Sequence, residues 1–291
     1  MNTSSLLSPQ EWAQQTFGTV RLGDQRRTKR AVAMACAMAH DPAGSLPAQM
    51  QGEARLEAAY RFLQTADVSY EQLQQPHLEQ TRAQARQHKR VLLIQDTTEV
   101  DYQQHPTTSG LGPIGNGSHQ GFLLQTVLAV LPTSREVLGI AHQEPFLRKP
   151  APKGESKRAR LLRERESQVW ERSVQAIGAP PGDVQWIHVG DRGSDIFPFL
   201  SLCRQMHCDF VVRAAQDRCV DVLVEQADAP VARPSHHKRR PEQELPQHLF
   251  EVLSSWKAQG EQDLHLEATK QSKARTAHVA LSFGSVRLWP C

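Results

Sequence analysis

The sequence lacks long apolar runs, and it contains few aromatic residues. Of its 291 residues, 39% are hydrophobic and 22% are charged, but only 6% are Phe, Trp or Tyr. No apolar stretch approaches the roughly 20 residues that a membrane-spanning helix needs. The start, from Met1 to Ser5, lacks the charged and apolar regions of a signal peptide. These absences argue against a membrane or secreted protein and predict a cytoplasmic one.

Cysteines are also few, and none forms a C-x-x-C pair. The five are Cys36, Cys203, Cys208, Cys219 and Cys291. An odd number without paired spacing predicts free thiols in a reducing compartment rather than a disulfide framework or a zinc site.

Positive charge is gathered in three segments, although the formal net charge is only +3. The first holds Arg21, Arg26, Arg27, Lys29 and Arg30. The second holds Arg148, Lys149, Lys153, Lys157, Arg158, Arg160, Arg163 and Arg165, and the third holds Arg233, His236, His237, Lys238, Arg239 and Arg240. Such clusters suit a polyanion that lies along an extended surface. Solvated helix faces and a basic loop are the other explanation, and the charges alone leave both open.

Two apolar segments of the sequence end in an aspartate. Residues 91–94 are Val-Leu-Leu-Ile and predict a buried central strand that ends at Asp96, followed by two threonines. Residues 184–189 repeat the pattern and lead through Gly190 to Asp191. Polar groups at the ends of neighbouring strands gather at one edge of a sheet. Two carboxylates there would form an oxygen-rich pocket suited to Mg²⁺ or Mn²⁺. Asp195 is predicted instead to cap the helix that follows.

The order of the predicted elements indicates a helical segment and then a mixed α/β sheet. Helices are predicted at 10–17, from Asp24 as N-cap to Ala39, at 53–62 and at 69–89. Strands are predicted next at 91–95, 123–131 and 137–146. A helix at 155–177, a strand at 184–190, a helix at 194–206 and a strand at 210–213 follow. Adjacent antiparallel strands followed by helix-crossover parallel strands predict a mixed sheet.

The last part of the chain predicts a small β-rich region. Residues 217–246 are basic and rich in proline, a short helix is predicted at 249–256, and strands at 265–268, 277–283 and 286–289. Since the alternation is still running at Trp289, we expect the chain to stop before this domain is finished.

Two further motifs are weaker. Residues 110–115 match G-x-G-x-x-G, but Pro113 and Asn116-Gly117 predict a turn into the next strand rather than a nucleotide site. Residues 96–100 partly fit the D-x-D-x-[TV] pattern of aspartyl-phosphate phosphohydrolases, but Thr98 replaces the second aspartate.

Several segments together resemble Tn5-like transposases of the IS4 family. They are Trp12-Ala13, Phe17-Gly18, residues 22–30, residues 58–63, residues 95–102, His142-Gln143-Glu144 and residues 190–196. The resemblance implies a helical transposon-end DNA-binding domain (1–88), an RNase H-like catalytic core (89–216) and a β-rich insertion (217–291). It also implies a bacterial, nucleoid-associated protein that binds double-stranded DNA, both transposon ends and target, and is a homodimer in the complete family form.

The same resemblance assigns roles to particular residues. Asp96 and Asp191 match the family's first two metal-binding aspartates, which hold Mg²⁺ or Mn²⁺ for DNA cleavage and strand transfer. It assigns DNA contacts to Arg26, Arg27, Lys29 and Arg30, and more weakly to Arg61. Tyr60 is predicted to belong to the core.

One element of the family's pattern is missing. The third carboxylate lies in a Tyr-x2-Arg-x3-Glu-x6-Lys segment, and the 291 residues contain no such segment. We therefore expect a catalytically incomplete, truncated transposase, and the alternative is a non-catalytic DNA-binding remnant that competes with the full-length enzyme.

Overall fold

The structure, a computed structural model, describes residues 7–149, 152, 154–156, 158–159, 165–223, 247–269 and 272–289. The chain divides into two compact units, Met1–Arg213 and Ala214–Cys291, which are described separately. The first unit contains both the helical segment and the sheet, so a domain boundary at residue 88 stays a prediction. The third basic cluster lies outside the described residues, as do Lys153, Lys157, Arg160 and Arg163 of the second. Within the described part of the chain, no helix has the length and apolar character needed to cross a membrane.

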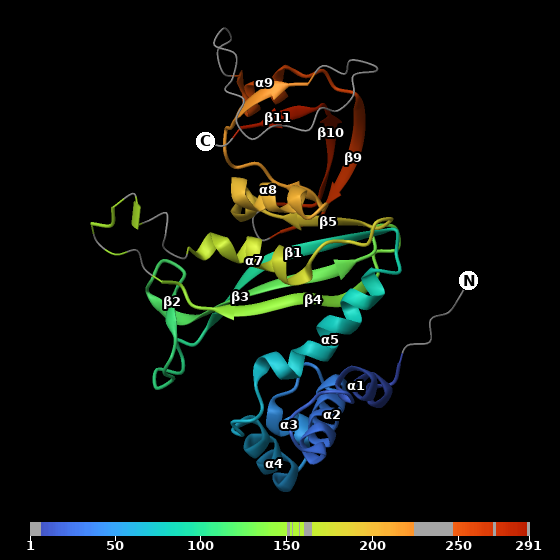
Figure 1. Cartoon of the computed structure of the whole chain (residues 1–291), viewed down its shortest axis with the longest axis vertical. Coiled ribbons are helices and arrows are strands. Elements are labelled where there is room, and N and C mark those ends of the chain that lie inside the picture. Colours follow the sequence, from blue (N-terminus) through green and yellow to red (C-terminus); the bar gives the residue numbers. More distant parts are fainter. Residues whose placement is uncertain are drawn as a thin grey trace. The chain divides into compact units, whose positions relative to one another are not determined.

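The first unit begins with helices, as the sequence predicts (Figure 1). They are α1 (Pro9–Phe17), α2 (Gln25–His40), α3 (Leu46–Met50), α4 (Glu53–Leu63) and α5 (Tyr70–Ala85). Local capping sets where they start: Ser8 and Glu11 form a capping box on α1, and the side chain of Asp24 accepts from the backbone N–H of Arg26. The short helix α3 was not predicted from the sequence.

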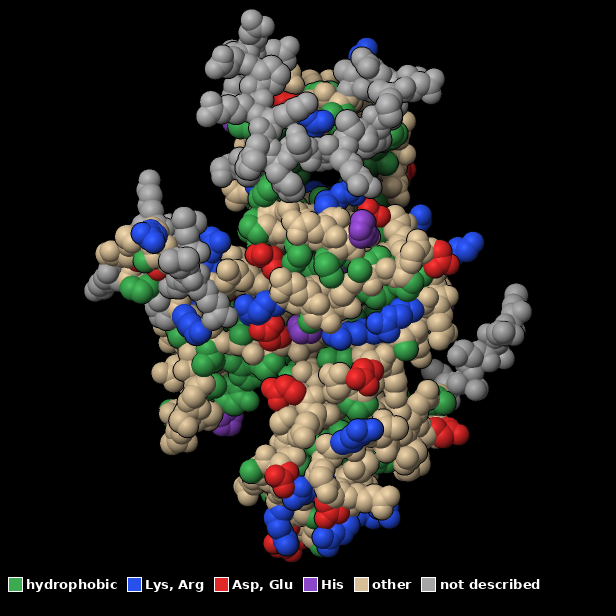
Figure 2. All heavy atoms as spheres, in the orientation of Figure 1, with side chains coloured by type: hydrophobic (Ala, Val, Ile, Leu, Met, Phe, Trp, Pro, Cys, Tyr) green, Lys and Arg blue, Asp and Glu red, His purple; other side chains and the backbone are tan. Residues whose placement is uncertain are grey.

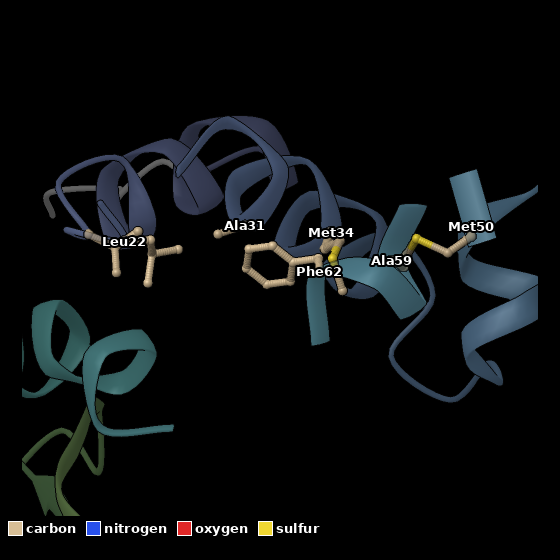
Figure 3. Packing of buried hydrophobic residues seen from close by; sticks show 7 residues of the cluster. Leu22, Ala31, Met34, Met50, Ala59 and Phe62 are labelled. Carbon is tan, nitrogen blue, oxygen red and sulfur yellow. The ribbon is translucent and has the colours of Figure 1, made fainter. Parts of the chain in front are cut away.

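Small and large apolar side chains alternate in the core of the helical segment (Figure 3). The cluster consists of Val20, Leu22, Ala31, Met34, Met50, Ala59 and Phe62. Ala31 and Ala59 let α2 and α4 approach closely, and Phe62 fills the space between them. Packing of these faces, rather than helix propensity, stabilises such short helices.

The predicted mixed sheet is confirmed. Its main path runs β4-β3-β1-β5-β6, and β2 pairs with the start of β3. The strands are β1 (Arg90–Asp101), β2 (Gly112–Ile114), β3 (His119–Val130), β4 (Val137–Phe146), β5 (Gln185–Gly190) and β6 (Asp209–Val212). β3 is antiparallel to β1 and β4, whereas β1, β5 and β6 are mutually parallel.

Helices cover one face and one edge of this sheet. On the buried face, Trp170 of α7 (Val169–Ile177) and Phe199 of α8 (Phe197–Gln205) make an edge-to-face contact with ring centroids 6.2 Å apart. At the β4 edge, Arg82 of α5 donates to the carbonyl of Ala141 (2.7 Å), and the backbone N–H of Ile140 donates to His77 Nε2 (3.1 Å). α5 thereby satisfies backbone groups of an edge strand that would otherwise be open to pairing.

Three predicted boundaries in the first unit are wrong. β1 does not end at Asp96 but continues to Asp101, because β3 pairs with it that far. The helix predicted at 155–177 is not continuous: residues 158–159 are helical, but the 3-10 turn η1 (Glu166–Gln168) interrupts it and α7 begins at Val169. Likewise α8 begins at Phe197, after the turn η2 (Arg192–Ser194), and its N-cap residue is Ile196 rather than Asp195, which is buried.

The second unit is a small α/β assembly. A three-stranded sheet joins β7 (Cys219–Val222), β8 (Gln247–His248) and β11 (Val286–Leu288), and a hairpin joins β9 (Gly260–Leu266) to β10 (Arg275–Leu281). Helix α9 (Leu249–Ser255) packs Leu249 and Val252 on Val220. The predicted helix and the last two strands are confirmed to within a few residues. The strand predicted at 265–268 lies earlier, as β9, and the sequence did not predict β7 or β8.

Candidate metal centre and nucleic-acid interface

Asp96 and Asp191 occupy equivalent positions at the centre of the sheet. The parallel ladder between β1 and β5 ends with the pair Ile94 and Val189. Each aspartate comes two residues after the last pair of this β1–β5 ladder, so Asp96 and Asp191 are at the same register position on neighbouring strands. Both line a single cavity of about 360 Å³. The structure therefore brings together the two residues that the sequence selects.

Backbone amides orient both carboxylates. Asp96 Oδ1 accepts from the backbone N–H of Thr97 at 2.8 Å, and Asp191 Oδ1 accepts from that of Gly193 at 2.8 Å. Asp191 is also the N-cap of η2. Both residues are exposed to solvent, so their carboxylates are open to the cavity while their direction is fixed locally.

A third carboxylate, Glu166, lines the same cavity. Arg148 holds it with a two-pronged ion pair, Nε to Oε2 at 2.8 Å and Nη2 to Oε1 at 3.2 Å, and also contacts Glu99 Oε1 at 3.4 Å. These carboxylates raise the pKa of Arg148 further. Sequence reasoning missed Glu166, because no local pattern connects residue 166 to the ends of β1 and β5.

The donor set suits a hard divalent cation. Asp96 and Asp191 supply only oxygen atoms, and Mg²⁺ is commonly held by one or two carboxylates, with waters and substrate phosphates completing its shell. Within the described residues, no group of three or more His, Cys, Asp or Glu side chains is arranged to hold a metal ion. The residues would fit a two-carboxylate site whose remaining ligands are waters and substrate oxygens, rather than a closed protein cage.

A chain of polar side chains lies buried beneath this site. Thr97, which lines the cavity, donates from its hydroxyl to Gln125 Oε1. Gln125 donates to Gln95, and Gln95 donates to His188 Nδ1. Burial lowers the pKa of His188 to about 4, so its ring is neutral at neutral pH.

The predicted DNA contacts lie on α2 and α4, and the structure separates them into two kinds. Lys29 is exposed, Arg30 is half-buried, and the side chain of Arg26 is 90% exposed beside Asp24 at 2.9 Å. Arg61 pairs with Glu57 at 2.6 Å on the surface of α4. Arg27 is different: its guanidinium donates to the carbonyl of Leu22 and pairs with Asp67, both at 2.8 Å.

The surface around these cations is mixed in charge. Figure 2 shows Lys and Arg side chains interspersed with Asp and Glu over the helical segment. Tyr60, predicted to be a core residue, is 46% exposed, so that prediction is wrong; its neighbour Phe62 fills the core instead. An exposed tyrosine beside Arg61 adds an amphipathic group to the same helix.

A comparison with protein families bears on this helical segment. Residues 9–68 match the family model "Transposase DNA-binding". The helical segment resembles a transposase DNA-binding domain. The match covers α1 to α4 and ends just before α5, so it includes every residue predicted to contact DNA and neither aspartate of the cavity. It supports a transposase and DNA as its partner.

Proposed function

We propose that this chain is a Tn5-like transposase of the IS4 family that binds the terminal repeats of its element through residues 9–68. The match of those residues to transposase DNA-binding domains carries the proposal. The exposed Arg26 and Lys29 and the half-buried Arg30 on α2 would contact the DNA backbone, while Arg27 would hold the loop containing Asp67 in place. Phosphate contacts of this kind position a protein on its duplex.

We propose further that Asp96 and Asp191 hold Mg²⁺ or Mn²⁺ for phosphodiester chemistry. Such an ion stabilises charge on the attacking and leaving oxygens of a phosphodiester. The chain's own part is to keep the two carboxylates at one register position and to orient them through Thr97 and Gly193. The strand order β4-β3-β1-β5-β6, with only β3 reversed relative to its neighbours, supports an RNase H-like core.

A non-catalytic end-binding protein is the second candidate function. One observation favours it: the family match covers residues 9–68, the DNA-binding segment, and neither aspartate of the cavity. In this case the cavity would bind an ion only weakly, and the protein would act by occupying transposon ends.

Binding is tested with duplexes tiled across the DNA that flanks the coding sequence. Fluorescence anisotropy should show one duplex bound at least about tenfold more tightly than a shuffled duplex of equal composition, since specific binding exceeds non-specific binding by large factors. The triple variant R26A/K29A/R30A should lose this preference. Equal affinity for all duplexes, or an unaffected triple variant, would contradict the proposed interface.

Cleavage then separates the two candidate functions. The preferred duplex is incubated with the chain and Mg²⁺ or Mn²⁺, beside Asp96→Asn as a control that leaves α1 to α4 untouched. Strand cleavage that Asp96→Asn abolishes supports the transposase, and binding without cleavage supports the end-binding protein.

A further inference from the structure

Three polar side chains are buried in the middle of the sheet. Gln95 on β1, Gln125 on β3 and His188 on β5 are 3%, 0% and 0% exposed. Their neighbours on the same face, such as Val91 and Leu93, are apolar and buried. Burying polar groups costs free energy unless they are hydrogen-bonded. We therefore expect these three residues to have a role besides packing the core.

Hydrogen bonds join the three residues into one chain across the strands. Thr97 Oγ1 donates to Gln125 Oε1, Gln125 Nε2 donates to Gln95 Oε1 at 3.3 Å, and Gln95 Nε2 donates to His188 Nδ1 at 2.7 Å. In each link one group donates and its neighbour accepts, so the chain is self-consistent. It begins at a residue that lines the carboxylate cavity and connects β3, β1 and β5.

The last of these links lies where two strands part. The backbone ladder between β1 and β5 ends at Ile94 and Val189. Beyond that point β1 continues along β3, while the chain after β5 turns into η2. Asp96 and Asp191 therefore lie just beyond the last backbone pair that joins β1 to β5. The bond between Gln95 and His188 joins the two strands just before the carboxylates.

In this link the Gln95 amide donates, so the His188 ring accepts at Nδ1 and carries its proton on Nε2, which is buried without a partner among the described residues. Burial keeps its ring neutral, because the pKa is lowered to about 4. Phe199 packs edge-on against the ring, with centroids 6.3 Å apart at an angle of 85°. A neutral, fixed imidazole presents the Nδ1 lone pair that the Gln95 amide requires.

We propose that Gln95, Gln125 and His188 are positioning residues that set the spacing of Asp96 and Asp191, and with it the divalent-metal affinity of the cavity. They act through the strands and touch neither metal nor DNA. The inference rests on the metal site given under the proposed function. Groups that orient metal ligands from behind typically change metal affinity by about 10- to 100-fold when they are removed, and the same range is expected here.

The test is a titration of the full chain with Mn²⁺ alone, followed by electron paramagnetic resonance. His188→Leu and Gln95→Leu break the link between β1 and β5, whereas His188→Gln keeps a carbonyl acceptor of similar reach. Trp186→Phe is the matched control, because Trp186 is equally buried on the same face of β5, two residues from His188, and takes no part in the link.

The proposal predicts that each leucine variant weakens Mn²⁺ binding by about tenfold or more. His188→Gln and Trp186→Phe should bind Mn²⁺ like the wild type. Folded leucine variants with unchanged affinity, or an equal loss in Trp186→Phe, would overturn it. If His188→Leu does not fold, Gln95→Leu and His188→Gln decide the matter. Asp96→Asn separates the two claims: if it leaves Mn²⁺ binding unchanged, the metal site itself fails and not the positioning alone.

Discussion

The helical segment and the sheet hold the charges of the two proposed sites in opposite ways. On α2 and α4, Arg26 and Arg61 pair with carboxylates of their own segment, Asp24 and Glu57, at the protein surface. In the sheet, Asp96 and Asp191 are oriented by backbone N–H groups, and a buried polar chain lies behind them. One region offers exchangeable surface cations, and the other offers fixed carboxylates.

This difference indicates how each region responds to change. Exposed ion pairs contribute little to stability and are screened by salt, so DNA phosphates can replace Asp24 or Glu57 at low cost. The separation of two carboxylates on different strands instead depends on the packing of the whole sheet. Substitutions on the helical surface should therefore alter binding without altering stability, whereas the cavity should respond to changes buried well below it.

The largest expected effect concerns the core that supports the helical surface. Phe62→Ala removes the ring between α2 and α4 and should lower the free energy of unfolding by about 3–5 kcal/mol. Tyr60→Ala, two residues away and exposed, is the matched control and should change it by less than about 1 kcal/mol. Urea denaturation measures both. Similar losses in the two variants would show that Tyr60 is also a core residue.

Acid should weaken the sheet through His188. Its pKa is about 4 in the folded protein, against 6.5 as the reference value, so the unfolded chain binds the proton more readily between these values. The stability due to the neutral ring is complete above about pH 6.5 and is lost as the pH falls to about 4, a loss of about 3 kcal/mol. Burial lowers the pKa of His77 and His142 as well, which adds to the same trend.

His188→Gln isolates this contribution, because the other titrating groups are unchanged. Urea unfolding of both proteins at about pH 7 and about pH 4 should show a smaller acid loss in the variant. An identical loss in the two proteins would mean that His188 is not the source.

The two carboxylates should dominate metal binding. D96N/D191N should weaken Mn²⁺ binding by more than about 100-fold, because removing ligands exceeds the effect of removing groups behind them. Asp183→Asn changes an exposed carboxylate just before β5 and should leave binding unchanged. Electron paramagnetic resonance measures free Mn²⁺ in each case. An equal effect of Asp183→Asn would indicate non-specific attraction of the ion to negative charge.

The smallest effects distinguish the two neighbouring arginines of α2. Arg26→Ala should reduce the salt slope of end-DNA binding by about 0.9 and change stability by less than about 0.5 kcal/mol. Arg27→Ala should instead cost about 1 kcal/mol of stability, because it loses its bonds to Leu22 and Asp67. Arg204→Ala, an exposed cation on α8, is the control. Equal salt slopes for Arg26→Ala and wild type would place the DNA elsewhere.

The sequence predicts features that depend on local chemistry. Asp24 caps α2 as predicted, because a cap involves residues only two or three positions apart. Asp191 follows β5 as predicted, since an apolar run that reaches a Gly-Asp pair has a clear end. The resemblance extends along most of the chain, whereas the family match covers residues 9–68.

Features set by distant pairing could not be predicted. β1 runs past Asp96 because Glu99 and its neighbours pair with β3 around Leu123, which the local sequence does not show. Glu166 reaches the cavity only through the placement of η1. The link between Gln95 and His188 joins residues 93 positions apart, and each alone resembles an ordinary polar interruption of a strand.

The most direct test of the central claim is iron-mediated cleavage of the chain bound to its preferred duplex. Fe²⁺ placed at the proposed site, with ascorbate and peroxide, generates radicals that cut the backbone next to the metal ligands. We predict protein fragments that end near Asp96 and Asp191, together with scission of the bound DNA, and the loss of both in Asp96→Asn. Fragments elsewhere in the chain, or the same fragments from Asp96→Asn, would contradict a metal centre formed by these two aspartates.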